Sequence, residues 1–508
     1  MAILGSLIKR AITLRGRIPQ RRSTYKRQVR ELRKLLLKAQ NTAFGQEYKF
    51  DKLLLEADPI SAYQNTVPIF DYQTMYDKWW KRALNGETYI TWPGRIKYFA
   101  LSSGTSESAS KQIPVTREMI KSIQRGTLKQ ILSTVHYNLP KEQFEKRILM
   151  IAGSTKLTYN GKYYSGDLSG ISTGTQPKWF QNFTLPGAKI RSKANWEDKI
   201  QGIVLNAKDW DVGFIAGVPA WIQILFERII EHYKVKTIHD IWPNLRIYVH
   251  GGVAVMPYKK SFENLTTFPL IYCDTYLASE GFFAYQERPN EPQGMKLMYD
   301  NKVFFEFIPF NEDNFDADGN LKPGHTVLDV SEVELDKEYA IIITNCAGAW
   351  RYILGDTVRF TDLRRCEIVV TGRIKHFLSL CGEHLPVENM TRAVKLSADE
   401  MGVDINEFCV AGVPYENLFA HHWYLGVNKA TDAEVIKGKI DEHLKNLNDD
   451  YKVERSAALK EIMVTVLPVE VFIEFLATKN KIGAQNKFPR VLKGKIYEEW
   501  LAFLEKRK

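Results

Sequence analysis

Patterns typical of buried strands alternate with helical patterns through most of the chain, and this alternation restricts the possible folds more than any other feature. The apolar runs 245–250 and 270–276 have the length of interior strands, whereas 221–233 has the periodicity of a helix. The two strand patterns run into Gly251-Gly252 and into Ser279-Glu280-Gly281. An α/β sheet places its ligand sites at the carboxyl ends of its strands. The sequence therefore predicts an α/β fold with a binding site at these strand ends.

The character of the sequence changes near Gly372-Arg373, where charged helical patterns and short strands replace the longer apolar runs. We expect residues 1–372 to form a large domain of mixed β-sheets and packed helices. Residues 373–508 have the length of a separate, smaller α+β domain. Residues 154–190, rich in Gly, Ser, Thr and Tyr, are predicted to be a loop region over a site.

The formal net charge of +11 suggests a nucleic-acid partner, but its distribution argues against one. Residues 1–38 contain twelve Lys and Arg side chains and one acidic residue, Glu31, so the rest of the chain is neutral overall. We expect no nucleic-acid partner. We also expect no transmembrane segment, since no apolar run approaches the roughly 18 residues that a span needs. The basic arm would allow a weak association with a membrane surface, although Leu4, Leu7 and Ile8 favour a helix docked on the body of the protein.

Cysteine usage predicts the compartment. The five cysteines are odd in number, widely spaced, and contain no Cys-x-x-Cys pair. Neither a disulfide framework nor a zinc site is indicated, so we expect free thiols and a cytoplasmic location.

A loop dense in hydroxyl side chains follows the apolar run 98–101. It contains Ser102, Ser103, Gly104, Thr105 and Ser106 and continues to Lys111. Backbone N–H groups, hydroxyls and a lysine charge together are suited to holding phosphate. The loop lacks the Gly-Lys-Ser/Thr end of a Walker A motif, and an exposed Ser-rich turn is the alternative interpretation.

Three other short patterns suggest different chemistry. The stretch 170–174, Gly-Ile-Ser-Thr-Gly, matches the nucleophile elbow of serine hydrolases, with Ser172 as nucleophile, but turn residues flank it where the motif needs a strand and a helix. The acidic run 311–324 resembles a calcium loop without its closing Glu, so an exposed hairpin loop is favoured. His421 and His422 would face opposite sides of a strand, which disfavours a metal site.

Three segments together resemble one family of enzymes. They are the hydroxyl-rich loop 102–111, the stretch Tyr-Leu-Ala-Ser-Glu-Gly at 276–281, and Trp-Arg-Tyr-Ile-Leu-Gly-Asp at 350–356 followed by Gly372-Arg373. Their order and spacing resemble the adenylate-forming superfamily of acyl-CoA synthetases, peptide-synthetase adenylation domains and luciferases. The chain is most similar to the auxin-responsive acyl acid amido synthetases of plants and their bacterial relatives. Further similarities extend from about residue 40 to residue 491, at 67–69, 92–94, 305–309 and 487–491.

The resemblance implies roles for the residues that would bind ATP. The loop from Ser102 to Ser106 would cradle the β- and γ-phosphates. Tyr276 would pack on the adenine, Gly251 and Gly252 would border the base, and Ala278 and Ser279 belong to the same ATP-binding segment. Asp356 would accept hydrogen bonds from the ribose hydroxyls, and Arg373 would lie at the hinge between the domains, close to the ribose or a phosphate.

The resemblance also implies two catalytic residues. Glu280 would hold Mg²⁺ against the phosphates, since this hard cation prefers carboxylate oxygen. Lys487, on a small domain that would be mobile, would approach the α-phosphate. Glu107 departs from the family pattern, because relatives often have small residues in this loop. A carboxylate beside a triphosphate is unfavourable unless it points away or binds the cation.

The implied reaction has two steps and uses ATP and Mg²⁺. A carboxylic acid would first become an acyl-AMP, and an amine, expected to be an amino acid, would then take the acyl group to form an amide. Two alternatives stay open. The acceptor could be a thiol such as coenzyme A, or the chain could be a non-catalytic, nucleotide-binding peripheral membrane protein.

Overall fold

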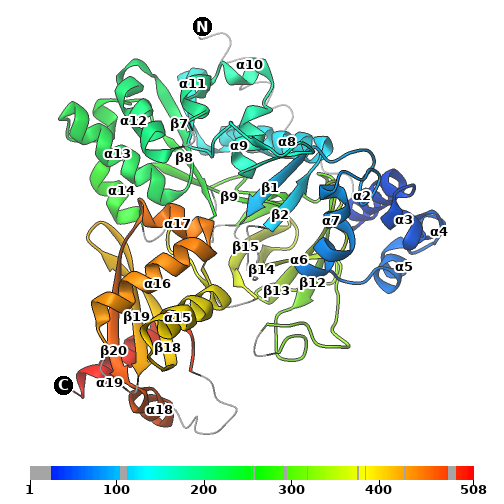
Figure 1. The fold of residues 1–508 in the computed structure, drawn as a ribbon. Helices are drawn as coiled ribbons and strands as arrows, with labels where there is room; N and C mark the ends of the chain where they lie inside the picture. Colours follow the sequence, from blue (N-terminus) through cyan, green and yellow to red (C-terminus); the bar gives the residue numbers. More distant parts are fainter. Residues whose placement is uncertain are drawn as a thin grey trace. The chain divides into compact units, whose positions relative to one another are not determined.

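The computed structural model describes residues 24–102, 111–193, 195–252, 255, 258–289, 294–316, 319–374, 377–383, 385–427, 429, 431–478 and 488–507 (Figure 1). These residues form two compact units. The larger unit draws on 24–102, 112–217 and 225–374, and the smaller mainly on 375–507 together with 218–224. The main division therefore follows Ile374, and the boundary between functional domains at 372 stays a prediction.

The larger unit is built on a mixed sheet that has 11 strands in the described part of the chain. From β6 through β3, β7 and β8 to β9 the strands are parallel. From β9 through β10, β11, β15, β14 and β13 to β12 they are antiparallel. The bounds are β3 (Arg147–Met150), β6 (Thr184–Leu185), β7 (Val212–Ala216), β8 (Ile247–Gly251), β9 (Ile271–Ala278), β10 (Gly281–Tyr285), β11 (Met295–Leu297), β12 (Val303–Pro309), β13 (Glu338–Asn345), β14 (Tyr352–Asp362) and β15 (Glu367–Arg373).

A second, four-stranded sheet has the order β2-β1-β5-β4 and comprises β1 (Tyr98–Ser102), β2 (Lys111–Val115), β4 (Thr158–Tyr159) and β5 (Tyr164–Gly166). The α-helices up to residue 265 are α2 (Thr24–Ala39), α3 (Ala43–Glu47), α4 (Phe50–Leu53), α5 (Pro59–Thr66), α6 (Tyr72–Met75), α7 (Lys81–Leu84), α8 (Arg117–Ser133), α9 (Leu168–Gly174), α10 (Lys178–Gln181), α11 (Ala188–Arg191), α12 (Trp196–Asn206), α13 (Pro219–Tyr233) and α14 (Lys259–Leu265). A π-helical turn, η1 (Tyr76–Trp80), and short 3₁₀ turns η2 (Thr134–Tyr137), η3 (Lys141–Glu145), η4 (Ala207–Asp209) and η5 (Ile238–Asp240) complete them.

Local sequence signals explain where several helices begin. Asp71 caps α6 in a capping box with Thr74, and the hydroxyl of Thr116 accepts the N–H of Met119 at the start of α8. Helix α2 buries Leu32 and Leu36 against the core. Its Gln28 side chain bonds the backbone of β12, the edge strand of the large sheet, and so covers groups that an edge would leave unpaired.

The prediction that 154–190 is a loop region was largely wrong. This stretch contains strands β4, β5 and β6 and helices α9, α10 and α11. Asp167 caps α9 through the N–H of Ser169, so Gly, Ser and Thr residues that resemble turn formers are held in a helix. Packing of Leu168 and Ile171 in the core outweighs the weak helix propensity of the Gly, Ser and Thr residues around them.

The smaller unit has a four-stranded sheet of order β20-β19-β18-β21 and a two-stranded hairpin, β16-β17. Helices α15 and α16 pack together, and α16 also packs on β20 (Figure 1). This confirms the predicted α+β character of the region. Its elements are β16 (Phe377–Leu378), β17 (Leu385–Pro386), α15 (Val387–Met401), β18 (Ile405–Tyr415), β19 (Leu418–Val427), α16 (Ala433–Leu447), α17 (Asp449–Arg455), β20 (Leu459–Pro468), α18 (Val469–Thr478), β21 (Val491–Leu492) and α19 (Gly494–Glu505).

A buried ion pair fixes the start of β14. Nε of Arg351 lies 3.1 Å from Oε1 of Glu306 on β12, and both side chains are almost fully buried. The Arg351 guanidinium also donates to the carbonyls of Gln64 and Val67, at 2.8 and 2.6 Å. Because a buried charge is costly unless paired, this network ties β12, α5 and β14 into one arrangement.

We expect Glu306→Ala to lower the free energy of unfolding of the larger unit by about 3–5 kcal/mol, because it leaves the Arg351 charge buried without its carboxylate. Urea unfolding monitored by hydrogen-exchange mass spectrometry would give the free energy of unfolding of each unit separately. Glu334→Ala, which removes the exposed partner of Lys337, is the control and should change little. Equal losses in the two variants would contradict a special role for the buried pair.

Candidate functional site

Asp356 joins two residues that are distant in the sequence. Its Oδ1 lies 2.6 Å from Nε of Arg373, its direct partner across β14 and β15. Its Oδ2 accepts a hydrogen bond of 2.6 Å from the hydroxyl of Tyr276 on β9. Burial, and then the charge of Asp356, raise the pKa of Tyr276 well above its ordinary value, so the phenol stays protonated and donates. Three predicted site residues thus meet at one carboxylate.

Glu280 lies in the tight turn between β9 and β10, beside this group. Its backbone carbonyl accepts a 2.8 Å hydrogen bond from the side chain of Asn345. Its carboxylate is a hydrogen-bond partner of Tyr352, and burial followed by the charge of Glu280 raises the pKa of that phenol. Burial alone would lower the pKa of Arg373, but the charge of Asp356, followed by those of Tyr276 and Glu280, raises it.

Sequence reasoning missed Tyr352 and Asn345, which hold Glu280 in place. A signal for Tyr352 existed, because it lies in the same 350–356 segment as the predicted site residue Asp356. For Asn345, the signal was a polar residue at the end of an apolar strand.

Gly251 ends β8 where the chain passes very close to β9. A Cβ atom at Gly251 would lie 2.3 Å from the carbonyl oxygen of Thr275, so only glycine fits. Gly252 follows with φ +82, in the left-handed region that glycine favours. Ala278 and Ser279 lie one strand away, at the end of β9 and in the turn that follows. The predicted ATP-binding glycines and this turn therefore belong to adjacent strand ends.

Several predicted residues lie outside the described part of the chain. These are Ser103, Gly104, Thr105 and Ser106, with Glu107, and also Lys487. Ser102 ends β1 and Lys111 begins β2, the neighbouring strand, so the hydroxyl-rich loop connects two adjacent strands. The basic residues before Thr24 and the expected docking residues Leu4, Leu7 and Ile8 are also outside the described ranges.

The structure excludes the nucleophile elbow. Ser172 lies inside α9, where its carbonyl accepts hydrogen bonds from Thr175, rather than at a turn between a strand and a helix. His421 and His422 face different partners, Glu383 and Thr465, as their adjacent places in β19 predict. Among the residues that the structure describes, no group of three or more His, Cys, Asp or Glu side chains could hold a metal ion.

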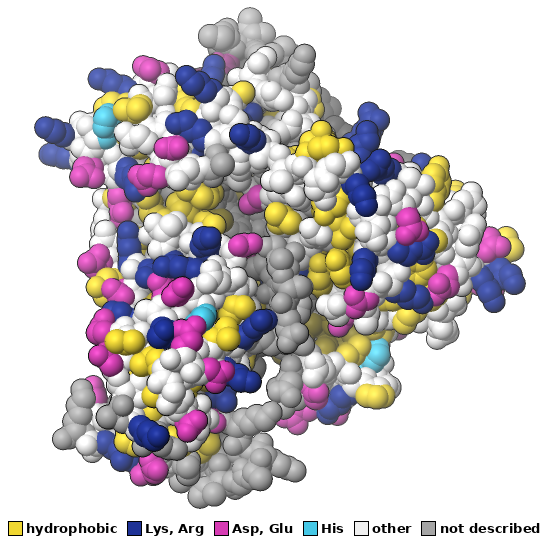
Figure 2. Space-filling model, in the orientation of Figure 1, with side chains coloured by type: hydrophobic (Ala, Val, Ile, Leu, Met, Phe, Trp, Pro, Cys, Tyr) yellow, Lys and Arg dark blue, Asp and Glu magenta, His cyan; other side chains and the backbone are white. Residues whose placement is uncertain are grey.

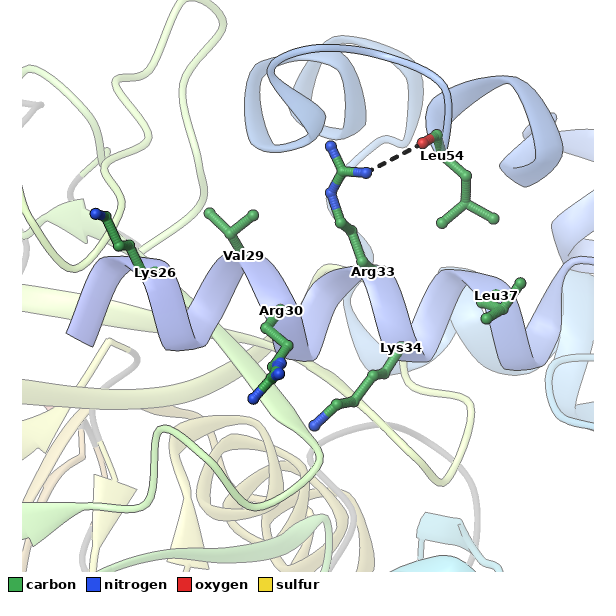
Figure 3. Close-up of a pocket in the computed structure, with 7 residues that line it drawn as sticks. All are labelled: Lys26, Val29, Arg30, Arg33, Lys34, Leu37 and Leu54. Carbon is green, nitrogen blue, oxygen red and sulfur yellow. Dashed lines mark hydrogen bonds between the residues drawn. The ribbon is translucent and has the colours of Figure 1, made fainter. Parts of the chain in front are cut away.

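A shallow pocket of about 480 Å³ lies along α2, apart from the residues named above (Figure 3). Arg33 turns toward α4 and donates to the carbonyl of Leu54 at 3.3 Å, while Arg30 and Lys34 project from another side of the helix (Figure 3). The pocket is lined by Lys26, Val29, Arg30, Arg33, Lys34, Leu37 and Leu54.

On the face shown in Figure 2, Lys and Arg side chains are interspersed with Asp and Glu. Among the described helices, none is both long and apolar enough to cross a bilayer.

The chain has relatives among curated plant enzymes. Indole-3-acetic acid-amido synthetase GH3.2 of Arabidopsis thaliana is 32% identical over 129 residues, which are 24% of this chain and 23% of that protein. Jasmonoyl–L-amino acid synthetase JAR4 of Nicotiana attenuata is 35% identical over 127 residues, 24% of this chain and 21% of that protein. These matches therefore span less than a quarter of each relative's length.

Solved structures share the fold over nearly the whole chain. GH3.15 acyl acid amido synthetase gives a TM-score of 0.59 at 16% identity, covering 98% of this chain and 96% of that one. A 2-hydroxyisobutyryl-CoA ligase in complex with 2-HIB-AMP and CoA gives 0.56 at 11% identity, covering 95% and 92%. These likenesses confirm the predicted α/β fold of the adenylate-forming ligases.

Three family models match in order along the sequence. The GH3 family N-terminal domain matches residues 20–215, the central domain 296–373 and the C-terminal domain 388–495. The matched ranges include Arg373 and Asp356. The three domains follow one another along the chain in the order N-terminal, central and C-terminal. The chain belongs to the GH3 family.

Proposed function

We propose that this chain is an ATP-dependent ligase that joins a carboxylic acid to an amine. In the first step the acid's carboxylate attacks the α-phosphorus of ATP, giving acyl-AMP and pyrophosphate. In the second step the amine, which we infer to be an amino acid, attacks the acyl carbon, forms an amide and releases AMP. The convergence of Tyr276, Asp356 and Arg373 from separate strands is the observation that carries the proposal. The relatives' names, amido synthetases and L-amino acid synthetases, support it.

The chemistry of the site fits the nucleotide. Asp356 uses one oxygen for Arg373 and the other for Tyr276, and each carboxylate oxygen keeps a further lone pair for a ribose hydroxyl. The adjacent strand ends at Gly251 and Ala278 would let the backbone approach the base closely. The loop from Ser102 to Ser106 remains our proposal for the β- and γ-phosphates.

Glu280 is our proposed Mg²⁺ ligand. Mg²⁺ is usually held by one or two carboxylates together with substrate phosphates and water, so a single carboxylate beside the nucleotide fits its needs. The cation would supply positive charge to the phosphate oxygens. Lys487 would add a second positive charge at the α-phosphate, and neutralising the charge that develops there lowers the barrier. Both assignments rest on the family pattern.

The division of the chain into two units supports separate roles for them in the reaction. We propose that the larger unit binds ATP and the acid, and that the smaller unit, beginning near Arg373, moves between the two steps. We also propose a cytoplasmic location, which the five buried free cysteines support.

Weak association with a membrane surface through the basic arm is a further part of the proposal. The exposed side of α2 continues the basic composition of the arm, with Arg30 and Lys34 among its exposed side chains (Figure 3). Anionic lipid surfaces attract such basic segments.

The nearest competing function replaces the amine with coenzyme A, because a CoA ligase shares the fold. Mass spectrometry after incubation with Mg·ATP, a panel of carboxylic acids, and either an amino-acid mixture or coenzyme A separates the two. We expect an acid-dependent amide with AMP as co-product. A thioester without any amide would contradict the amine acceptor. AMP release in the absence of both the acid and the acceptor would contradict the reaction class.

We expect Glu280→Gln to raise the Mg²⁺ concentration for half-maximal activity at least about tenfold, because the amide loses the charge that holds the cation. A Mg²⁺ titration of the initial rate at saturating ATP measures this. Glu312→Gln, at an exposed position in the loop between β12 and β13, is the matched control and should leave the titration unchanged. An unaltered Mg²⁺ requirement in Glu280→Gln would remove this residue from the metal site.

A further inference from the structure

A buried carboxylate organises the turn of the β16–β17 hairpin in the smaller unit. The Glu383 side chain has no exposed surface, and it accepts backbone N–H groups from its own turn. Leu380 donates to Oε1 at 2.8 Å, and Cys381 and Gly382 donate to Oε2 at 2.9 and 3.2 Å. Gly382 has φ +117, which lets the turn close around the carboxylate.

His421 on β19 completes this arrangement from the sheet. Its Nε2 lies 3.0 Å from Oε1 of Glu383, and its ring is also fully buried. Burial alone would raise the pKa of Glu383, but the hydrogen bond and charge of His421, with the backbone N–H groups, lower it to about 2. Glu383 therefore stays charged, and its charge is satisfied only while the turn keeps this shape.

Other ionisable groups surround the pair, and among them is Tyr451, whose ring centroid lies 5.9 Å from that of His421. The sulfur of Cys381 lies 3.4 Å from Oε2 of Glu383, and Oε1 of Glu454 lies close to Gly382. Burial lowers the pKa of Lys493, and the charge of Glu383 opposes this shift. None of these groups has a role in the function proposed above.

The anchored turn lies close along the chain to the candidate ATP site. Arg373, which is bonded to Asp356, is followed by Ile374, and β16 begins at Phe377. Phe377 is four residues after Arg373, and four residues of fully extended chain span at most about 14 Å. The hairpin is therefore the first element of the smaller unit after this connection.

We propose that Glu383 and His421 are a positioning pair for the ligase reaction: they hold the Leu380–Gly382 turn in the shape that the smaller unit must present during turnover. The proposal rests on the proposed function. It differs from a purely structural role, because breaking the pair should slow turnover in enzyme that is still folded. ATP binding should not change, since the proposed ATP contacts of Asp356 and Tyr276 lie in the larger unit.

The test compares Glu383→Gln with Asp441→Asn. Asp441 is also a largely buried carboxylate of the smaller unit, bonded by Tyr451 and Arg455 at 2.8 and 2.9 Å, but it makes no bond to the turn. We expect Glu383→Gln to lower kcat at least about tenfold at an unchanged KM for ATP, because an amide cannot satisfy all the donors that face it. Asp441→Asn should keep kcat per folded molecule, and Glu383→Asp should recover part of the lost rate.

Cysteine alkylation tests the anchor without relying on activity. Cys381 and Cys409 are both fully buried in the smaller unit, so iodoacetamide should modify neither in the native protein. In Glu383→Gln we expect Cys381, and not Cys409, to be alkylated faster, as peptide mass spectrometry would show. Asp441→Asn should leave Cys381 protected.

Three results would overturn the proposal. They are unchanged Cys381 protection in Glu383→Gln, faster alkylation with normal kcat, or an equal loss of kcat in Asp441→Asn. A wild-type protein without acid-dependent activity would instead contradict the proposed function, and the alkylation of Cys381 would still decide whether the pair anchors the turn.

Discussion

The carboxylate of Asp356 is the contact on which the candidate site depends. In the order of the large sheet, β14 and β9 are separated by β15, β11 and β10, yet Tyr276 reaches Asp356 with a 2.6 Å hydrogen bond. The antiparallel partner of Asp356, Arg373, closes the group from β15. One buried acceptor thus joins the parallel and antiparallel halves of the sheet at the place where their strand ends carry glycine and acidic residues.

This carboxylate is held by structure built well away from it. The buried pair of Arg351 and Glu306 fixes the chain just before β14, and Trp350 donates to the carbonyl of Thr91 at 2.9 Å. Asn345 at the end of β13 bonds the turn that carries Glu280. Burial of these polar groups is tolerated because each is bonded. A site positioned in this way is rigid before any ligand arrives, which reduces the cost of binding.

Much of this arrangement could be predicted from the sequence, because the signals were local. Strand-like runs, caps at Asp71 and Thr116, and the motif ending at Asp356 each depend on neighbouring residues. The helix at 168–174 could not be predicted, since its weak formers are held by packing with distant residues. The bond between Tyr276 and Asp356 and the pairing of Glu383 with His421 join residues 80 and 38 positions apart, and no local pattern encodes such contacts.

The central claim is that the Asp356 cluster belongs to an acid-adenylating site. The most direct measurement is ATP–pyrophosphate exchange by the full chain against a panel of carboxylic acids, with the wild type compared with Asp356→Asn. We expect exchange that requires both Mg²⁺ and a particular acid, and a marked rise in the KM for ATP in the variant. Absence of exchange with every acid, or an unchanged KM for ATP in Asp356→Asn, would contradict it.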